Sequence, residues 1–291
     1  MKLTLKIWKY IFIYSILAPH LKRILPSVLH QKLLVFPQIG YWPQIREPRT
    51  FNEKILHRKL FTENEQFSTV EDKWQVRDYV STQVGEDILA DVYYLTDDPS
   101  TIPFDELPDE FVIKPTHLSG PVRIVDKKAT EDWEAMRNTC ERWLSQRHGE
   151  IRNEYWYSSI KPRVIVEERL RDDEHDVPLD FKFFVFHGEV KYIQVDMDRF
   201  SEHSRRLYDR EWNPLEVSLK YPKGPVISEP EKLDKMVSVA DQLGDEFDFI
   251  RVDLYQLNDQ RVVFGELTVG PGSGEERFKP VDYDFEFGSH W

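Results

Sequence analysis

Apolar side chains recur at three- and four-residue steps in five stretches of the chain, which predicts helices. The predicted helices cover residues 3–36, 52–62, 71–83, 130–147 and 230–243. Pro19 and Pro26 divide the first stretch into two or three helices, because proline cannot continue a helix. Thr50 or Asn52 can cap the second helix, and Gly85 stands where a helix-ending glycine is expected.

Short apolar runs rich in β-branched and aromatic residues predict strands, mainly after residue 88. They cover residues 88–95, 110–115, 122–125, 163–170, 180–186, 190–197 and two runs within 250–268. The stretches 37–50, 97–109 and 201–225 connect these elements, the last with short strands of its own. Hairpins rather than repeated strand–helix–strand units are indicated, so we predict the α+β class with a helical N-terminal segment.

Composition limits the size of the protein and the kind of partner it binds. The 291 residues are 40% hydrophobic, which is enough for one large domain or two to three lobes around a cleft. The net charge of -13 argues against a nucleic-acid partner, whose binding surface is usually basic. Cys140 is the single cysteine and lies in a helical pattern, where we expect a small buried side chain.

The N-terminal residues 1–25 are apolar and basic. Lys6 and Lys9 interrupt the apolar run, so it is too short for a membrane-spanning helix, and no cleavage site typical of a signal peptide follows. Two interpretations remain: an amphipathic helix that packs on its own protein, or one that lies on a membrane surface. Trp8, Tyr10 and the flanking lysines fit the second, while the first is the commoner use of such a helix.

The stretch 250–274 contains two apolar runs that each carry one carboxylate, Asp253 and Glu266. On neighbouring strands these carboxylates would form a seat for magnesium, which prefers a few carboxylate oxygens together with phosphates. Arg251 shares a strand face with Asp253 and can hold a substrate carboxylate or a developing oxyanion. A surface ion-pair network is the alternative, but the apolar flanks and the glycine-rich loop that follows favour a cleft.

Several lysines are candidates for phosphate contacts. Lys114 ends a strand before a loop that contains His117, Ser119 and Gly120, whose hydroxyl and backbone N–H groups can hold a phosphate. Taken alone, Lys114 and Lys73 are better explained as solvated side chains. Lys182 stands between phenylalanines on a strand, where alternation lets it point into a polar cleft while Phe181 and Phe183 pack on the opposite face. A buried ammonium needs an anionic partner.

Glu167 and Glu168 end an apolar strand, where adjacent side chains point to opposite faces. One of them can turn into a cleft and accept a hydrogen bond from a ribose hydroxyl, while the local backbone contacts an adenine edge. A strand end that enters solvent beside Arg169 and Arg171 is an equally good interpretation.

The motifs DK, FVIKP with its loop, IVEE, DFK, RVD and GELT with PGSG occur in an order that resembles the ATP-grasp superfamily. Over roughly residues 50–288 the chain looks most like the TupA-like ATP-grasp family, which is linked to cell-surface polymer and polysaccharide biosynthesis. The resemblance implies an ATP-grasp fold in which two α+β lobes enclose a nucleotide cleft. The usual N-terminal βαβ lobe of the superfamily is not evident, since residues 1–62 are predicted to be a helical N-terminal segment. After this segment we expect a central lobe (63–109), a small lobe (110–170) and a large lobe with the metal site (171–291).

The resemblance further implies a role for each candidate residue. Lys73, Lys114 and Lys182 match phosphate-contacting lysines, and residues 117–121, including His117, Ser119 and Gly120, match the phosphate loop. Glu167 and Glu168 match the hinge beside adenine and ribose. Asp253 and Glu266 match the magnesium ligands, with Thr268 standing where many ATP-grasp enzymes have asparagine. Arg251 and Lys182 match the residues that act on the transition state.

The implied activity is ATP- and Mg²⁺-dependent ligation of a carboxylate to an amine or thiol through an acylphosphate, in cell-surface polysaccharide or glycopolymer synthesis. The expected partner is a small-molecule or glycan substrate, and the expected location is cytoplasmic, with residues 1–25 touching the inner face of the membrane. A nucleotide-sugar-dependent glycosyltransferase-like enzyme and a non-catalytic nucleotide-binding scaffold are the alternatives.

Overall fold

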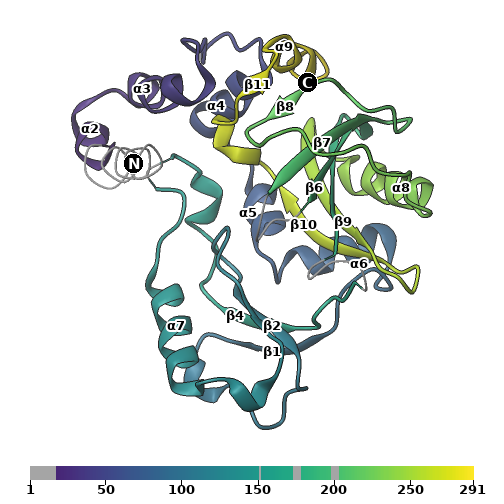
Figure 1. Cartoon of the computed structure of the whole chain (residues 1–291). Coiled ribbons are helices and arrows are strands. Elements are labelled where there is room, and N and C mark those ends of the chain that lie inside the picture. The colour runs from purple at the N-terminus through teal and green to yellow at the C-terminus, as the bar shows by residue number, and fades with distance from the viewer. Residues whose placement is uncertain (1–17, 151, 173–177, 198–202) are drawn as a thin grey trace, which may run out of the picture.

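Two antiparallel sheets form the body of the computed structural model, which describes residues 18–150, 152–172, 178–197 and 203–291 (Figure 1). The four-stranded sheet has the order β1 (Val92–Thr96), β4 (Val164–Glu167), β2 (Phe111–Pro115), β3 (Arg123–Val125). The five-stranded sheet has the order β10 (Val262–Thr268), β9 (Phe249–Gln256), β5 (Asp180–Phe186), β6 (Glu189–Met197), β7 (Ser204–Asp209). The predicted α+β class is confirmed.

The four-stranded sheet is covered on one face by α7 (Trp133–Ser145). Phe111, Ile113 and Val164 point toward this helix, which buries Met136 and Cys140 between sheet and helix. Cys140 is therefore a free, buried side chain as predicted, and burial raises the pKa of its thiol to about 11. The alternation of a strand leaves Val112 and Lys114 on the opposite face, toward the other sheet.

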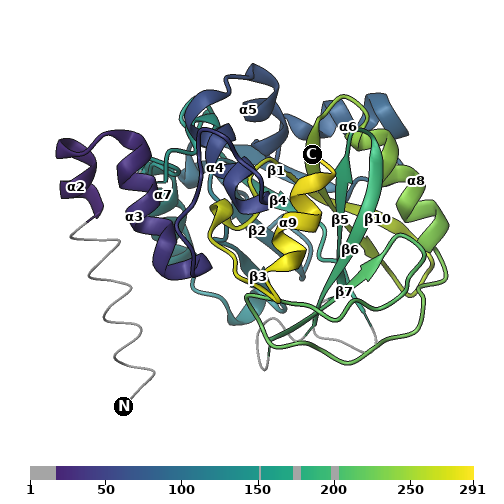
Figure 2. The same ribbon diagram turned by 90° about the horizontal axis from the view of Figure 1, so that it is seen from above.

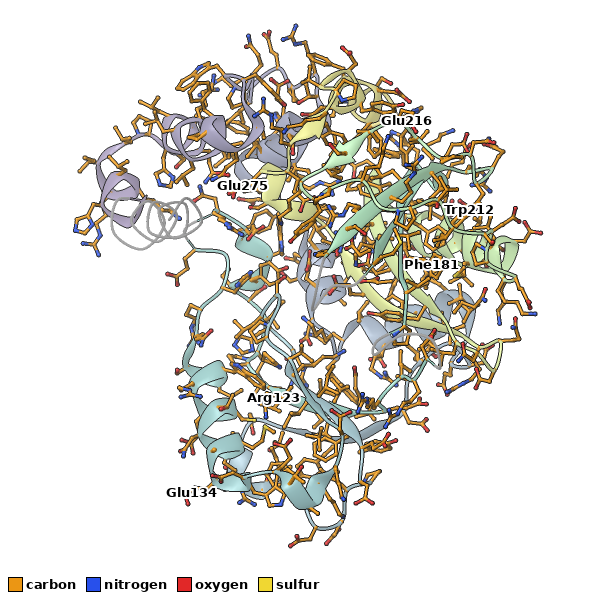
Figure 3. All side chains as sticks on the ribbon, in the orientation of Figure 1. Arg123, Glu134, Phe181, Trp212, Glu216 and Glu275 are labelled. Atoms are coloured by element: carbon orange, nitrogen blue, oxygen red, sulfur yellow. The ribbon has the colours of Figure 1, made fainter. Side chains whose placement is uncertain are left out.

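The five-stranded sheet is covered on one face by α8 (Leu233–Gly244), against which α6 (Val76–Val84) also packs. On β5, Phe181, Phe183 and Val185 belong to this core. Figure 3 shows Phe181 and Trp212 inside this lobe, where their rings lie 6.2 Å apart. This core alone buries most of the large apolar side chains of the lobe.

The other face of the five-stranded sheet is divided into an apolar part and a charged part. Phe184 and Phe186 of β5 pack with Phe51 of α4 (Phe51–Phe61) and Phe287 of α9 (Asp282–Ser289). The short strands β8 (Ser218–Leu219) and β11 (Phe278–Lys279) pair beside this cluster. Further along the same face lie the buried charged residues Asp180, Lys182 and Asp253, of which Asp180 and Asp253 face the four-stranded sheet.

The N-terminal segment (1–62) contains α2 (Ala18–Ile24) and α3 (Ser27–Ile39), which lie at one edge of the molecule, and then α4 (Figure 2). The break at Pro26 is confirmed, whereas α3 continues through Pro37 to a left-handed Gly40, so the connector begins later than predicted. In α4 the capping residue is Thr50, which exchanges hydrogen bonds with Glu53 in a capping box. Residues 1–17, including Trp8 and Tyr10, lie outside the described residues.

The predicted helix over 71–83 is confirmed from Val76 on and ends before Gly85 as expected, but its predicted start is wrong. The chain instead forms α5 (Glu65–Glu71) and α6, separated by a turn over 72–75. The Asp72 carboxylate causes this break, because it accepts hydrogen bonds from the backbone N–H of Trp74 and the side chain of Gln75. Lys73 therefore lies in a turn rather than on a helix, and it does not share a helical face with Arg77.

The predicted strand over 163–170 is shorter than predicted and ends at Glu167. The first predicted strand likewise starts at Val92 rather than at residue 88. Among the helices described, none is long and apolar enough to cross a membrane.

Candidate active site

A cavity of about 340 Å³ lies between the two sheets. Its apolar part is lined by Val112 and Ile124 from the four-stranded sheet and by Tyr255 and Phe264 from the five-stranded sheet. Its polar part holds most of the residues predicted from the sequence: Lys73, Lys114, Ser119, Gly120, Glu167, Glu168, Asp253 and Glu266. An apolar slot that continues into a charged region suits a ligand with a flat ring and an anionic tail.

Lys73 and Lys114 enter this cavity from different elements. Lys73 is held against the loop that follows β2: its backbone N–H donates to Thr116 O, and its Nζ donates to Leu118 O at 2.7 Å. Burial lowers the pKa of Lys73, although nearby Glu266 acts in the opposite direction. Lys114 forms an ion pair with Glu167 of the neighbouring strand β4. Both ammonium groups thus lie on the polar side of the cavity.

The loop after β2 contributes unequally. Ser119 and Gly120 are exposed and line the cavity, and Gly120 adopts a left-handed φ of 103°. His117, in contrast, is buried and lines neither this cavity nor the smaller one described below. Burial lowers the pKa of His117, which lies near the carbonyl groups at the end of α7. The structure therefore separates His117 from the other predicted phosphate-loop residues.

Glu167 and Glu168 lie at the edge of the cavity where β4 ends. The Glu168 side chain accepts a hydrogen bond from Arg261 of the five-stranded lobe at 2.9 Å. Because its backbone N–H binds Asp91 O at 2.8 Å, this N–H is already used within the protein. Glu168 thus connects the two sheets, while Glu167 pairs with Lys114.

Asp253 is the centre of a buried charge cluster on the five-stranded sheet. Lys182 donates to both Asp253 and Asp180, and Arg251 donates to Asp253 through Nε at 2.6 Å and Nη2 at 2.8 Å. Burial acts to lower the pKa of Lys182, but Asp180 and Asp253 raise it above its ordinary value. Burial raises the pKa of the Asp253 carboxyl, whereas Arg251 and Lys182 act to lower it.

Glu266 lies directly opposite Asp253 on the neighbouring strand, as predicted for a hairpin. Its side chain is 44% exposed, faces both cavities, and accepts a hydrogen bond from Arg251 at 3.1 Å. The preceding Gly265 forms a bulge in which a Cβ atom would lie only 2.9 Å from the Tyr255 ring. Glycine is thus required before Glu266, which explains the GELT motif.

The donors around Glu266 fit magnesium. The carboxylates of Asp253 and Glu266 are oxygen ligands on adjacent strands, and Thr268 places its hydroxyl 2.9 Å from Arg251 and 3.4 Å from Glu266. No group of three or more His, Cys, Asp or Glu side chains within the described ranges is arranged to hold a metal by itself. Magnesium commonly takes one or two carboxylates and completes its shell with phosphates and water, so this donor set is sufficient.

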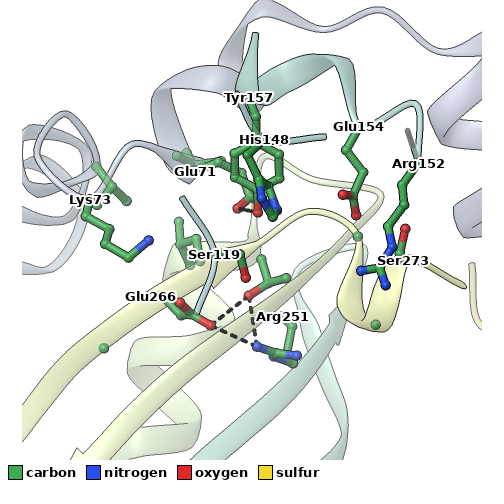
Figure 4. Close-up of a pocket in the computed structure, with 17 residues that line it drawn as sticks. Glu71, Lys73, Ser119, His148, Arg152, Glu154, Tyr157, Arg251, Glu266 and Ser273 are labelled. Atoms are coloured by element: carbon green, nitrogen blue, oxygen red, sulfur yellow. Dashed lines mark hydrogen bonds and ion pairs between the residues drawn. The ribbon is translucent and has the colours of Figure 1, made fainter. Parts of the chain in front are cut away.

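A second cavity of about 190 Å³ adjoins the first and shares Lys73, Ser119, Gly265 and Glu266 with it (Figure 4). Glu71 lines this second cavity and accepts hydrogen bonds from Tyr157 Oη at 2.7 Å and Val269 N–H at 2.8 Å. Burial raises the pKa of Glu71 to about 7. The remaining charged or titratable lining residues are Arg152, His148, Glu154 and Arg251.

The floor of the second cavity is a left-handed turn in the glycine-rich loop. Gly272, Ser273 and Gly274 have φ values of 56°, 58° and 70°. The buried Lys59 of α4 donates to both the carbonyl and the hydroxyl oxygen of Ser273, at 2.9 and 2.8 Å. This lysine fixes the turn, so that the loop predicted to leave the metal strand is held in one shape.

Sequence reasoning missed Glu71, Arg152, Glu154, Tyr157 and Ser273. Glu71 directly precedes the DK motif, and its position beside Lys73 was the available signal. Arg152, Glu154 and Tyr157 belong to a segment with little regular structure, which reaches the cavity only through the tertiary fold. No spacing pattern in the sequence marks such residues.

A family model described as TupA-like ATPgrasp matches residues 53–291 of the chain. No curated protein matches it. Among solved structures, D-alanine–D-alanine ligase from Bacillus anthracis complexed with ATP is similar at 16% identity and a TM-score of 0.41, over 70% of this chain and 55% of that one.

Two further solved structures are similar to this chain. An ADP complex of N5-carboxyaminoimidazole ribonucleotide synthetase shows 14% identity and a TM-score of 0.45, over 71% and 46% of the two chains. L-amino acid ligase from Bacillus licheniformis shows 14% identity and a TM-score of 0.42, over 71% and 42%. The chain spans about half the length of the solved structures that it matches.

Proposed function

We propose that this chain, which belongs to the TupA-like ATP-grasp family, is an ATP-dependent ligase that joins a carboxylate to an amine through an acylphosphate. The observation that carries the proposal is the pair of adjoining cavities with a common wall at Lys73, Ser119 and Glu266. A nucleotide in the larger cavity would present its terminal phosphate at this wall. An acceptor in the smaller cavity would meet it there, as in-line transfer requires.

The larger cavity supports nucleotide binding in two ways. Val112, Ile124 and Phe264 provide apolar surface for a base, and Lys73 and Lys114 provide positive charge for phosphates. Asp253 and Glu266 would hold magnesium, which would offset the negative charge of the phosphates. Lys182 and Arg251 keep Asp253 ionised and fixed in position, so the protein's own cations organise the metal end of the site.

In the smaller cavity, Arg251 and Arg152 would bind the acceptor carboxylate, whose oxygen attacks the terminal phosphorus while ADP departs. The amine then attacks the acyl carbon, phosphate leaves, and the amine loses a proton. Glu71 is positioned to take that proton, because it lines this cavity and burial raises its pKa to about 7. The proposed acceptor is part of a cell-surface glycopolymer or its precursor, as the TupA-like family membership suggests.

ADP release in the presence of ATP, magnesium and a panel of sugar acids and amino acids tests the proposal. We expect the rate of ADP release to depend on an acceptor carboxylate and to fall about a hundredfold or more in Glu266→Gln. The rate should be unchanged in the control Glu134→Gln, because the Glu134 side chain lies on the exposed side of α7 (Figure 3). Equal rates for Glu266→Gln and wild type would overturn the metal assignment. Binding of a UDP- or GDP-sugar in place of ATP would indicate a nucleotide-sugar enzyme instead.

A further inference from the structure

Positive charge is concentrated at the start of the chain. Residues 1–46 contain seven Lys or Arg and no Asp or Glu, whereas residues 47–291 contain 32 Lys or Arg and all 52 Asp and Glu. The net charge of -13 therefore combines a segment of +7 with a body of -20. A basic segment on a strongly acidic protein indicates that an anionic partner binds at this segment and not at the rest of the surface.

The described part of this segment also exposes apolar side chains. Leu29, Leu33 and Phe36 recur at helical spacing on one face of α3 and are 38%, 42% and 45% exposed. The opposite face of the same helix is buried against the protein. Trp42 is 49% exposed, and its ring lies 5.8 Å from that of Phe36. The helix therefore has one face for its own core and a second apolar face that the described chain leaves uncovered.

Basic side chains border this apolar face. Lys32 lies over the Trp42 ring at 5.7 Å, and the exposed Arg23 adjoins Ile24, which is 75% exposed at the end of α2. We define the α3 surface as Arg23, Ile24, Leu29, Lys32, Leu33, Phe36 and Trp42. Helices α2 and α3 lie together at one edge of the molecule (Figures 1 and 2).

We propose that the α3 surface docks onto an anionic lipid surface. Leu29, Leu33 and Phe36 would enter the boundary between headgroups and acyl chains, and Trp42 would lie at headgroup level, where tryptophan is enriched. Arg23 and Lys32 are attracted to anionic headgroups, and the acidic body is repelled from them, which fixes the orientation. A soluble acidic partner would use the charges but gives no reason for five exposed apolar side chains beside them.

Flotation of the full chain with phospholipid vesicles tests this proposal. We expect binding to vesicles of equal parts phosphatidylglycerol and phosphatidylcholine, weakening as salt is added, and little binding to phosphatidylcholine alone. Two variants should each reduce partitioning about tenfold or more: Arg23→Glu with Lys32→Glu, and Leu33→Ser with Phe36→Ser. Because all four side chains are partly or largely exposed, we expect the variants to unfold at the wild-type temperature.

Matched controls carry the same chemical changes elsewhere. Lys235→Glu alters a half-exposed lysine of α8, and Val226→Ser alters a 59% exposed valine, and both should bind like wild type. The proposal is overturned if wild type does not bind vesicles that contain phosphatidylglycerol. It is also overturned if both double variants bind as well as wild type, since binding would then be assigned to residues 1–17. If wild type self-associates but binds no lipid, and the double variants do not self-associate, a second copy covers the α3 surface. That result would also overturn the proposal.

Discussion

The two proposed metal ligands should differ sharply in what they contribute to stability. Asp253 is 1% exposed and accepts hydrogen bonds from both Lys182 and Arg251. Asp253→Asn leaves two buried cations with only part of their compensation, and loss of one partner from a buried ion pair costs about 3–5 kcal/mol. Glu266 is 44% exposed, and in Glu266→Gln the guanidinium of Arg251 keeps Asp253, so we expect a cost of about 1 kcal/mol or less.

Urea unfolding without nucleotide or metal measures this difference, and ADP release measures function in the same proteins. We expect both variants to lose ADP release, but only Asp253→Asn to lose about 3 kcal/mol or more of unfolding free energy. Equal unfolding midpoints for the two variants would refute the argument that Asp253 organises the buried charges. Full ADP release by Asp253→Asn would show that the cluster serves the fold alone.

Three further outcomes are expected. Lys73→Met and Lys114→Met should each weaken ATP binding, measured by calorimetry, about ten- to a hundredfold, because each loses a charged hydrogen bond. Lys235→Met should leave the affinity unchanged. Wild-type affinity in both Lys73→Met and Lys114→Met would contradict the phosphate assignment. The pKa of Glu71 is raised from 4.5 to about 7 in the folded chain, so ionising it costs up to about 3 kcal/mol as pH rises through that interval. Glu71→Gln should therefore become more stable relative to wild type between pH 4.5 and 7, and parallel pH curves from urea unfolding would count against this. Arg58→Met should lower the unfolding free energy by about 3 kcal/mol, because two buried backbone carbonyl groups lose their donor, and a variant as stable as wild type would show that water replaces it.

The sequence was informative where a local pattern determines the structure. The alternation in residues 180–186 put Lys182 and Phe181 on opposite faces, and the structure bears this out. Asp253 and Glu266 were predicted on neighbouring strands of a hairpin, and the structure pairs them there; the bulge at Gly265 was not predicted. Thr50 and Asn52 were the two candidates for the cap of α4, and Thr50 is the cap, through a side chain that acts within one turn of helix.

The sequence was less informative where structure depends on competing or distant groups. A turn over residues 72–75 replaces the first turn of the helix predicted over 71–83, because the Asp72 carboxylate accepts hydrogen bonds that the periodicity does not include. Glu71 accepts hydrogen bonds from Tyr157 and from the backbone N–H of Val269, which lie about 90 and 200 positions away in the sequence. His117 was assigned to the phosphate loop with its neighbours, but its ring turned inward toward α7.

The left-handed turn at Ser273 has a consequence for how this site tolerates change. Its two neighbours in that conformation are glycines, which adopt it freely, whereas a serine there costs about 1–2 kcal/mol. A chain selected only for an easy turn would have a third glycine. Serine offsets this cost because its hydroxyl accepts a hydrogen bond from Lys59. The backbone strain at this position is thus coupled to a contact that holds the cavity floor in place. A substitution to glycine would be expected to stabilise the turn while loosening what the turn supports.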